Sequence, residues 1–158
     1  MMKTLDYLGL EPKGVKKSVD GLQELLASFQ VYYTNLRGFH WNVKGMMFFG
    51  AHARFEEYYD DAAAKVDEIA ERILMLGGVP AHNFSDYLKA SAIKETEVIS
   101  DHKEILKLIL DSLKVLIELE RKVLENASEG NDEGTVALMS DFIASQEKTV
   151  WMLTATLS

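Results

Sequence analysis

Apolar residues recur at alternating steps of four and three positions through most of the chain, a spacing typical of helices that bury one face. The first stripe follows a polar stretch, residues 1–12, and consists of Val15, Val19, Leu22, Leu26, Phe29, Tyr33 and Leu36. His40 is the next position of this stripe, so we expect an imidazole on the buried side of the helix near its C-terminal end. Gly45 indicates that the helix has ended by that point.

A second stripe has the same spacing and contains His52, Phe55, Tyr59, Ala62, Val66, Ile69, Ile73 and Leu76. It predicts one long helix that ends at Gly77, Gly78 and Pro80, because glycine and proline interrupt helices. The segment that follows is too long for a tight turn and contains an amphipathic fragment from Phe84 to Leu88. We therefore expect a crossover that carries a short helix.

Two more helices complete the pattern. The third is expected to start near Ala92 and to run through Ile99, Leu106, Ile109, Leu113, Leu116 and Val123, until the sequence SEGNDEG ends it. The fourth is expected through Val136, Met139, Ile143, Gln146, Val150 and Leu153. No segment alternates with period two, so no strands are predicted. The pattern predicts an all-α, ferritin-like four-helix bundle with a short extra helix in the crossover between the second and third long helices.

Composition narrows the class of protein. Residues 1–158 are expected to form a single domain with residues 1–12 as a short arm, since the chain is 47% hydrophobic and of ordinary domain length. The absence of cysteine excludes thiolate metal sites and favours a reducing cytoplasm. The N-terminus lacks the apolar core of a signal peptide, and no apolar run is long enough to span a membrane. A formal charge of -8 argues against nucleic-acid binding by the body of the protein and suits cations.

Five side chains of the first two helices are candidate metal ligands: His40, His52, Glu56, Asp67 and Glu71. Imidazoles combined with carboxylates suit redox-active iron better than structural zinc. A helix turns about 100° per residue, so the last four share one face of the second helix. However, 15 residues at about 1.5 Å each separate His52 from Asp67 by roughly 22 Å. One chain alone cannot close such a site.

Two copies of the chain can close the site. Antiparallel packing of the first two helices brings His40 and His52 together beside their common turn. If the second helices of two copies pack antiparallel about a twofold axis, the histidine end of one meets Asp67 and Glu71 of the other. The run Ala62 to Ala64 permits close approach at that axis. This arrangement predicts two equivalent sites in each dimer.

A di-iron centre inside one bundle is not expected. Such centres place a glutamate three residues before a histidine on two of the helices. The residues three positions before the four histidines are Arg37, Phe49, Val79 and Ile99.

Each candidate also has a purely structural interpretation. His40 on an apolar stripe could be a hydrogen-bonded core histidine, but a second histidine on the adjoining stripe, beside the same turn, favours ligands. Asp67 and Glu71 could belong to an exposed charged face with Lys65 and Arg72, but their place beside the apolar stripe favours partial burial. His82 and His102 are interpreted as surface or structural histidines. The simplest interpretation of the acidic group Glu129, Asp132, Glu133 and Asp141 is a turn with a charge bias at the N-terminus of the fourth helix.

Several segments together resemble a known family. They are FHWNVKG at residues 39–45, His52, Glu56, the run VDEIAERILMLGG at residues 66–78 with Pro80, and EKTVWML in the last helix. These segments resemble the Dps family, the DNA-protection-during-starvation miniferritins, and the resemblance covers essentially the whole chain. The interval from HWN to the second histidine and on to DEIAER is characteristic of that family.

The resemblance implies a hollow shell of twelve subunits with ferroxidase centres at its twofold interfaces. Each centre would take two iron ions, bound by His40, His52 and Glu56 of one subunit and by Asp67 and Glu71 of its partner. Such proteins oxidise ferrous iron, typically with hydrogen peroxide, and store ferric oxide in the cavity, which suppresses hydroxyl-radical formation. Glu56 stands where relatives often have aspartate. Trp41 resembles the family tryptophan thought to intercept oxidising equivalents, and its alternative interpretation is an interface aromatic.

DNA binding in this family usually depends on flexible lysine-rich extensions. Residues 1–17 hold Lys3, Lys13, Lys16 and Lys17 against Asp6 and Glu11, which gives 4 - 2 = +2 per arm. We expect DNA binding to be weak at most, because Lys13 to Lys17 fall in the first helix. The alternative function is a DNA-binding, nucleoid-compacting shell protein with little metal chemistry. Either function predicts a cytoplasmic protein, in the second case associated with the nucleoid.

Overall fold

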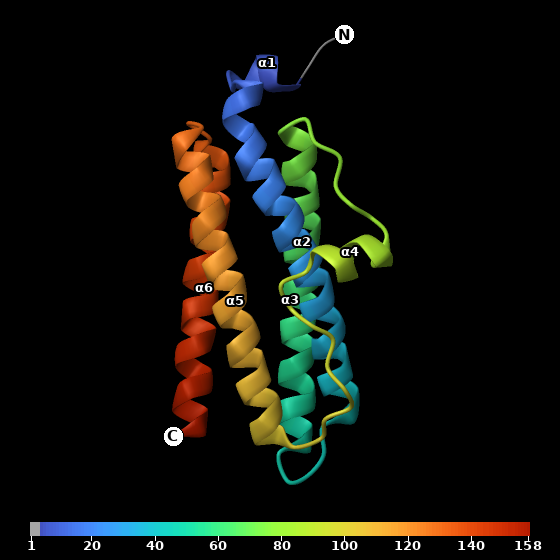
Figure 1. Cartoon of the computed structure of the whole chain (residues 1–158). Coiled ribbons are helices and arrows are strands. Elements are labelled where there is room, and N and C mark those ends of the chain that lie inside the picture. Colours follow the sequence, from blue (N-terminus) through green and yellow to red (C-terminus); the bar gives the residue numbers. More distant parts are fainter. Residues whose placement is uncertain (1–3) are drawn as a thin grey trace.

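The computed structural model describes residues 4–158, and every regular element within that range is a helix. The long helices are α2 (Pro12–Asn42), α3 (Phe48–Met75), α5 (His102–Glu129) and α6 (Glu133–Leu157), and the short ones are α1 (Thr4–Leu8) and α4 (Phe84–Ala90). Figure 1 shows the four long helices side by side, with α2 and α3 forming one antiparallel pair and α5 and α6 the other. The predicted four-helix bundle with a short crossover helix is confirmed.

The bundle is joined through a single apolar core. Phe29, Phe55, Ile69, Ile109 and Leu116 are among its fully buried side chains and come from α2, α3 and α5, and Met139 contributes from α6. Helix α2 packs against both α3 and α5, so it is the central element of the bundle. Helix α4, which belongs to the crossover between α3 and α5, lies against α2. Among the described residues, no helix has the length and apolar character that crossing a membrane requires.

Helix α3 ends because two glycines, Gly77 and Gly78, follow it. Gly77 has φ +80°, in the left-handed region that side chains with a Cβ rarely adopt. Its N–H donates to the carbonyl of Leu74 at 3.0 Å, and the N–H of Gly78 donates to that of Ile73 at 2.9 Å. This pair of bonds is the Schellman arrangement that satisfies the last carbonyls of a helix.

The predicted start of the third long helix near Ala92 is wrong. Residues 91–101 are not helical, and α5 begins at His102 with Asp101 as its N-cap, whose carboxylate accepts the N–H of Glu104 at 2.8 Å. The extended segment is held by α2. Asn35 donates to the carbonyl of Lys94 and accepts the N–H of Thr96, at 2.9 and 3.1 Å. These bonds satisfy the backbone of the extended segment without a helix.

The predicted N-terminal arm contains a helical turn. Residues 4–8 form α1, where Leu5 is buried close to Gly77 at the end of α3. Lys3, which was counted in the charge of the arm, lies outside the described residues. The part of the arm that the structure describes therefore packs on the bundle through Leu5.

Candidate metal half-sites

The two candidate histidines meet beside the turn between α2 and α3. Their imidazole rings are stacked, with centroids 3.7 Å apart and planes inclined by 19°. Nδ1 of His40 lies 2.7 Å from the backbone oxygen of His52, and Nδ1 of His52 lies 2.8 Å from the backbone oxygen of His40. The hairpin thus brings together two histidines that are twelve positions apart, and each fixes the other.

These reciprocal bonds determine which ring nitrogen is free. A carbonyl oxygen can only accept a hydrogen bond, so Nδ1 carries the proton in both rings. In the neutral imidazole the lone pair is then on Nε2, the atom through which such a ring binds a metal ion. His40 lies in the last turn of α2, where backbone carbonyls have no intrahelical partner, and the ring of His52 supplies that missing donor. The histidines therefore cap a helix end and leave two ligand atoms free.

Aromatic rings enclose this pair. Phe48 is stacked on the ring of His52 with centroids 5.1 Å apart, and Tyr59 packs edge-on against His40 at 5.3 Å. His40 is buried, whereas His52 is half-buried. Burial and then the neighbouring carboxylates of Glu56 and Asp60 raise the pKa of Tyr59, so its phenol is protonated at neutral pH.

Glu56 supplies the carboxylate nearest to this pair in sequence. It follows His52 by four residues on α3, which places the two side chains on one face of the helix. Its side chain is exposed. Two imidazoles and a carboxylate are therefore available on one copy of the chain.

Asp67 and Glu71 lie in the far half of α3. Both are exposed, so the partial burial predicted for them is wrong for the single chain. Their exposure agrees with the alternative interpretation, in which both carboxylates are solvated on a charged face. Neither forms an ion pair with another described residue, because Lys65 and Arg72 pair with other carboxylates. Lys65 pairs instead with Asp61 at 2.5 Å. The two carboxylates thus have no basic partner within the described residues.

Arg72 holds this end of α3 in place. Its guanidinium forms an ion pair with the buried carboxylate of Asp132, the N-cap of α6, at 2.5 Å and donates to the Thr135 hydroxyl at 2.9 Å. Asp132 also accepts the backbone N–H and the hydroxyl of Thr135. The turn and helix-N-terminal role predicted for Asp132 is confirmed. Arg72 therefore faces the bundle while Glu71, its neighbour, faces outward.

No three histidine, aspartate or glutamate side chains within residues 4–158 converge on a point where they could hold a metal ion. The histidine end and the Asp67–Glu71 end of α3 are instead two incomplete ligand sets. We call them the histidine half-site (His40, His52 and Glu56) and the carboxylate half-site (Asp67 and Glu71).

Trp41 lies beside the histidine half-site on the exposed side of α2. Its side chain is 61% exposed, and the guanidinium of Arg37 lies 4.7 Å from its ring centroid. The same guanidinium lies 5.4 Å from the ring of Tyr33. The other two histidines are structural or on the surface, as predicted: His102 stacks on Phe55, and His82 is exposed.

Two contacts of the histidine half-site, Phe48 and Tyr59, were not identified as functional from the sequence. Tyr59 follows His52 by seven residues, which is two helical turns, so its position on the same stripe was the available signal. Phe48 precedes His52 by four residues, about one helical turn, so its sequence position also placed it on the same face of the helix.

A second polar cluster lies in the middle of the bundle. Glu120 of α5 is fully buried, and one of its oxygens lies 2.5 Å from the side-chain nitrogen of Gln146 on α6. The ammonium of Lys65 is buried nearby, paired with Asp61 and 5.1 Å from the ring of Phe142. Burial raises the pKa of Glu120 to about 8, so it is mainly protonated at neutral pH. This core cluster already contains its own cation.

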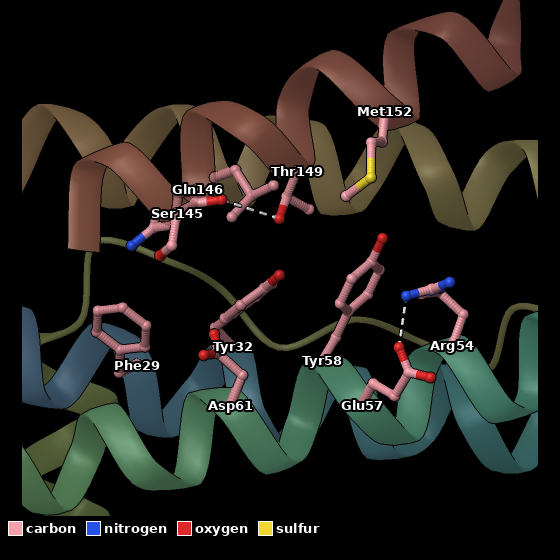
Figure 2. A pocket seen from close by; sticks show the side chains of 11 residues that line it. Phe29, Tyr32, Arg54, Glu57, Tyr58, Asp61, Ser145, Gln146, Thr149 and Met152 are labelled. Carbon is pink, nitrogen blue, oxygen red and sulfur yellow. Dashed lines mark hydrogen bonds and ion pairs between the residues drawn. The ribbon is translucent and has the colours of Figure 1, made fainter. Parts of the chain in front are cut away.

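A cavity of about 220 Å³ adjoins the core cluster between α3 and α6. Figure 2 shows Tyr32 and Tyr58 directed from α2 and α3 toward Gln146 and Thr149 of α6, with the Arg54–Glu57 ion pair at one side. Tyr58 thus lines this cavity, whereas the next residue, Tyr59, packs against His40.

Comparison with known proteins places these features in context. The model of the ferritin-like domain family matches residues 19–158. The DNA protection during starvation protein of Porphyromonas gingivalis is 49% identical over 155 residues, which cover 98% of each chain.

Solved structures give the same relationship. The crystal structure of a Dps protein from Vibrio cholerae O1 superposes with a TM-score of 0.95 at 46% identity, covering 100% of this chain and 99% of that one. That protein is described as a member of a broad superfamily of ferritin-like diiron-carboxylate proteins. The Dps of Staphylococcus aureus gives a TM-score of 0.86 at 32% identity, over 89% of this chain and 95% of that one.

Proposed function

Because the chain belongs to the Dps family of ferritin-like proteins, we propose that it oxidises ferrous iron and stores the ferric product as mineral inside a hollow homo-oligomeric shell. One observation carries the proposal. His40 and His52 donate Nδ1–H to each other's backbone carbonyl and so leave two Nε2 lone pairs side by side. The same bonds cap the end of α2, and they also fix both rings in the tautomer and orientation that a metal-binding imidazole requires.

Ferrous iron is the substrate that fits the donor set. Imidazole nitrogens and carboxylate oxygens suit this borderline cation, and no thiolate is present to favour zinc or copper. His40, His52 and Glu56 would bind two ferrous ions together with Asp67 and Glu71 of a second copy. The carboxylates stabilise the higher charge of the ferric product. With hydrogen peroxide as oxidant, two ferrous ions give up one electron each, and the peroxide takes two electrons and two protons to form two waters.

A second copy is required by the length of α3. Along a straight helix, residues 52 and 67 lie roughly 22 Å apart, which no single coordination sphere spans. Antiparallel pairing of α3 with its symmetry mate about a twofold axis would bring each histidine half-site to a carboxylate half-site. We propose a dodecamer, as the family resemblance implies. Removal of ferrous iron and peroxide together would protect the cell and its DNA, which accords with the name of the Porphyromonas gingivalis relative.

The Asp67→Ala, Glu71→Ala double variant tests the shared site. Its iron oxidation, followed by the near-ultraviolet absorbance of the ferric product after peroxide is added, should fall to the protein-free rate. The Asp60→Ala, Glu68→Ala double variant is the matched control, because it removes two exposed carboxylates from the same helix. Light scattering reports whether both variants keep the wild-type assembly. Wild-type oxidation rates in the Asp67→Ala, Glu71→Ala variant would contradict the proposal.

DNA binding is expected to be weak. Lys16 and Lys17 belong to α2, where they pair with Asp20 and Glu129 at 2.6 and 3.1 Å. These exposed pairs are worth little individually, but they hold two of the arm's four positive charges on the helix surface. A gel shift that appears only at low ionic strength would agree with this expectation, and a shift that persists at physiological salt would favour a nucleoid-compacting shell. Either function accords with the predicted cytoplasmic location.

A further inference from the structure

The core cluster contains two buried oxygen atoms that nothing in the described part of the chain satisfies. Oε2 of Glu120 and Oε1 of Gln146 are both buried and have no hydrogen-bond partner there. The two side chains are joined only through their other atoms, because Nε2 of Gln146 donates to Oε1 of Glu120. Buried polar atoms without a partner are uncommon in proteins, and each one calls for an explanation such as a bound water molecule or an ion.

Lys65 supplies a positive charge close to these oxygens. Its side chain is 7% exposed, and its ammonium lies 2.5 Å from a carboxylate oxygen of Asp61. The same ammonium lies 5.1 Å from the ring centroid of Phe142, which precedes Gln146 by about one turn of α6. Its charge also acts on Glu120, where it opposes the rise in pKa that burial causes. The ammonium therefore occupies the middle of the core cluster, among oxygen atoms from three helices.

The oxygen atoms around this ammonium suit a divalent metal ion. Asp61 and Glu120 offer carboxylate oxygens and Gln146 offers an amide oxygen, and such ligands suit ions of the Mn²⁺ and Mg²⁺ type. They come from α3, α5 and α6, whose relative positions are fixed by the apolar core. Asp61 and Gln146 also line the cavity of about 220 Å³, which has room for water molecules as further ligands (Figure 2).

The charges explain why the ammonium and such an ion exclude each other. A metal ion would take the place of the Glu120 proton, since it binds the carboxylate form. Two carboxylates then balance one divalent ion, and the group is neutral. With the ammonium of Lys65 still present, the group would carry one uncompensated positive charge beside the apolar core, which is strongly unfavourable. An ion in solution therefore competes with a cation that is part of the chain.

We infer that Lys65 fills a divalent-cation site formed by Asp61, Glu120 and Gln146, and so keeps metal ions out of the interior of the bundle. Metal binding is thereby confined to the two half-sites. This exclusion does not depend on any oxidation chemistry, and only its consequence for iron rests on the proposed function. Ferrous iron would be directed to the site shared by two subunits, where the ferric product can enter the hollow shell, instead of being oxidised within one subunit.

Equilibrium dialysis of the assembled protein against Mn²⁺, followed by metal analysis, tests this inference. Lys65→Ala vacates the position and should bind one more Mn²⁺ per chain than the wild type. Adding Glu120→Gln to Lys65→Ala should abolish this extra binding, whereas adding Glu118→Gln should not, because Glu118 is exposed on the same helix. Lys65→Met removes the charge but still fills the space, so it should bind no more Mn²⁺ than the wild type.

A second measurement uses stability. Mn²⁺ should raise the midpoint of urea unfolding of Lys65→Ala by more than that of the wild type, because a ligand that binds only the folded state stabilises it. Circular dichroism and light scattering show whether each variant is folded and assembled. Lys65→Ser vacates the same position with a small polar side chain and replaces Lys65→Ala in both measurements if the alanine variant does not assemble.

The outcomes separate this inference from the proposed function. A folded and assembled Lys65→Ala or Lys65→Ser variant that binds no additional Mn²⁺ would overturn the inference. Additional Mn²⁺ that remains after Glu120→Gln would also overturn it, since the ion would then lie elsewhere. Neither result bears on the site shared by two subunits. Conversely, wild-type iron oxidation in the Asp67→Ala, Glu71→Ala variant would overturn the proposed function and leave this inference in place.

Discussion

The protein contains two polar clusters within one apolar bundle, and they handle charge in opposite ways. In the core cluster, Lys65 pairs with Asp61 and burial keeps Glu120 largely protonated, so the group is close to neutral without any outside ion. In the histidine half-site, both imidazoles give their only N–H to backbone carbonyls and keep a lone pair. No lysine or arginine among the described residues is hydrogen-bonded to either ring.

The comparison shows that carboxylate content alone does not mark a cation site. The core cluster contains a buried carboxyl group, Glu120, but the Lys65 ammonium already provides the positive charge that a metal ion would supply. The histidine half-site and the distant Asp67 and Glu71 carry ligand atoms that nothing in the described chain neutralises. A site that is incomplete in one subunit is therefore the better candidate for metal binding than one that is complete.

The largest effect is expected from His52→Ala. This change removes one ligand and the hydrogen bond that fixes His40, so the affinity for a ferrous surrogate such as Co²⁺ should fall by more than the roughly 10- to 100-fold that loss of an outer-shell partner costs. Titration followed by visible absorbance measures the affinity. His82→Ala, at an exposed position, is the control. Equal Co²⁺ affinity in the two variants would show that the histidine half-site does not bind the metal ion.

Lys65→Met should act on stability and leave metal binding unchanged. It removes the ammonium from the core cluster together with its ion pair to Asp61, whose carboxylate is 60% exposed and stays solvated, so the free energy of unfolding should fall by at most about 1 kcal/mol. Urea unfolding followed by circular dichroism measures this cost. Lys122→Met on the exposed face of α5 serves as its control and should change little. Loss of Co²⁺ binding in Lys65→Met would show that the two clusters are coupled.

Glu120→Gln should change the pH dependence of stability. Because burial raises the pKa of Glu120 from 4.5 to about 8, the folded chain keeps a proton between these values that the unfolded chain has lost. This group therefore makes the protein less stable as the pH rises through that window, by at most about 1.4 kcal/mol per pH unit. The amide has no such proton, so the variant should show a flatter profile in urea unfolding from pH 5 to 8. Glu118→Gln, exposed on the same helix, should keep the wild-type slope.

The long helices could be predicted because their stripes are long and regular. The sequence also located the histidine pair, since both residues fall on apolar stripes beside one turn. The start of α5 could not be predicted in this way, because Ile93 and Ile99 have the spacing of a helical stripe in a segment that is not helical. That segment is fixed by Asn35 and Ser28 on α2, whose side chains bond its backbone across about sixty positions of sequence.

The finer structure of the half-sites also required three dimensions. The reciprocal bonds of His40 and His52 depend on the register between two helices, which the spacing along each helix does not determine. The same holds for the contact of Tyr59 with His40. The exposure of Asp67 and Glu71 was misjudged because they adjoin the apolar stripe in sequence, whereas Arg72, the next residue, turns inward to Asp132.

The uninterrupted α3 also restricts how this sequence can change over evolution. Between Ala51 and Leu76 the helix has no glycine or proline to absorb an insertion. Adding or deleting one residue between positions 56 and 67 would turn the carboxylate half-site by about 100° and move it by about 1.5 Å relative to the histidines. In a twofold assembly this displacement would disrupt both shared sites of the dimer at once. The length of this segment should therefore vary less among descendants than the identity of its surface residues.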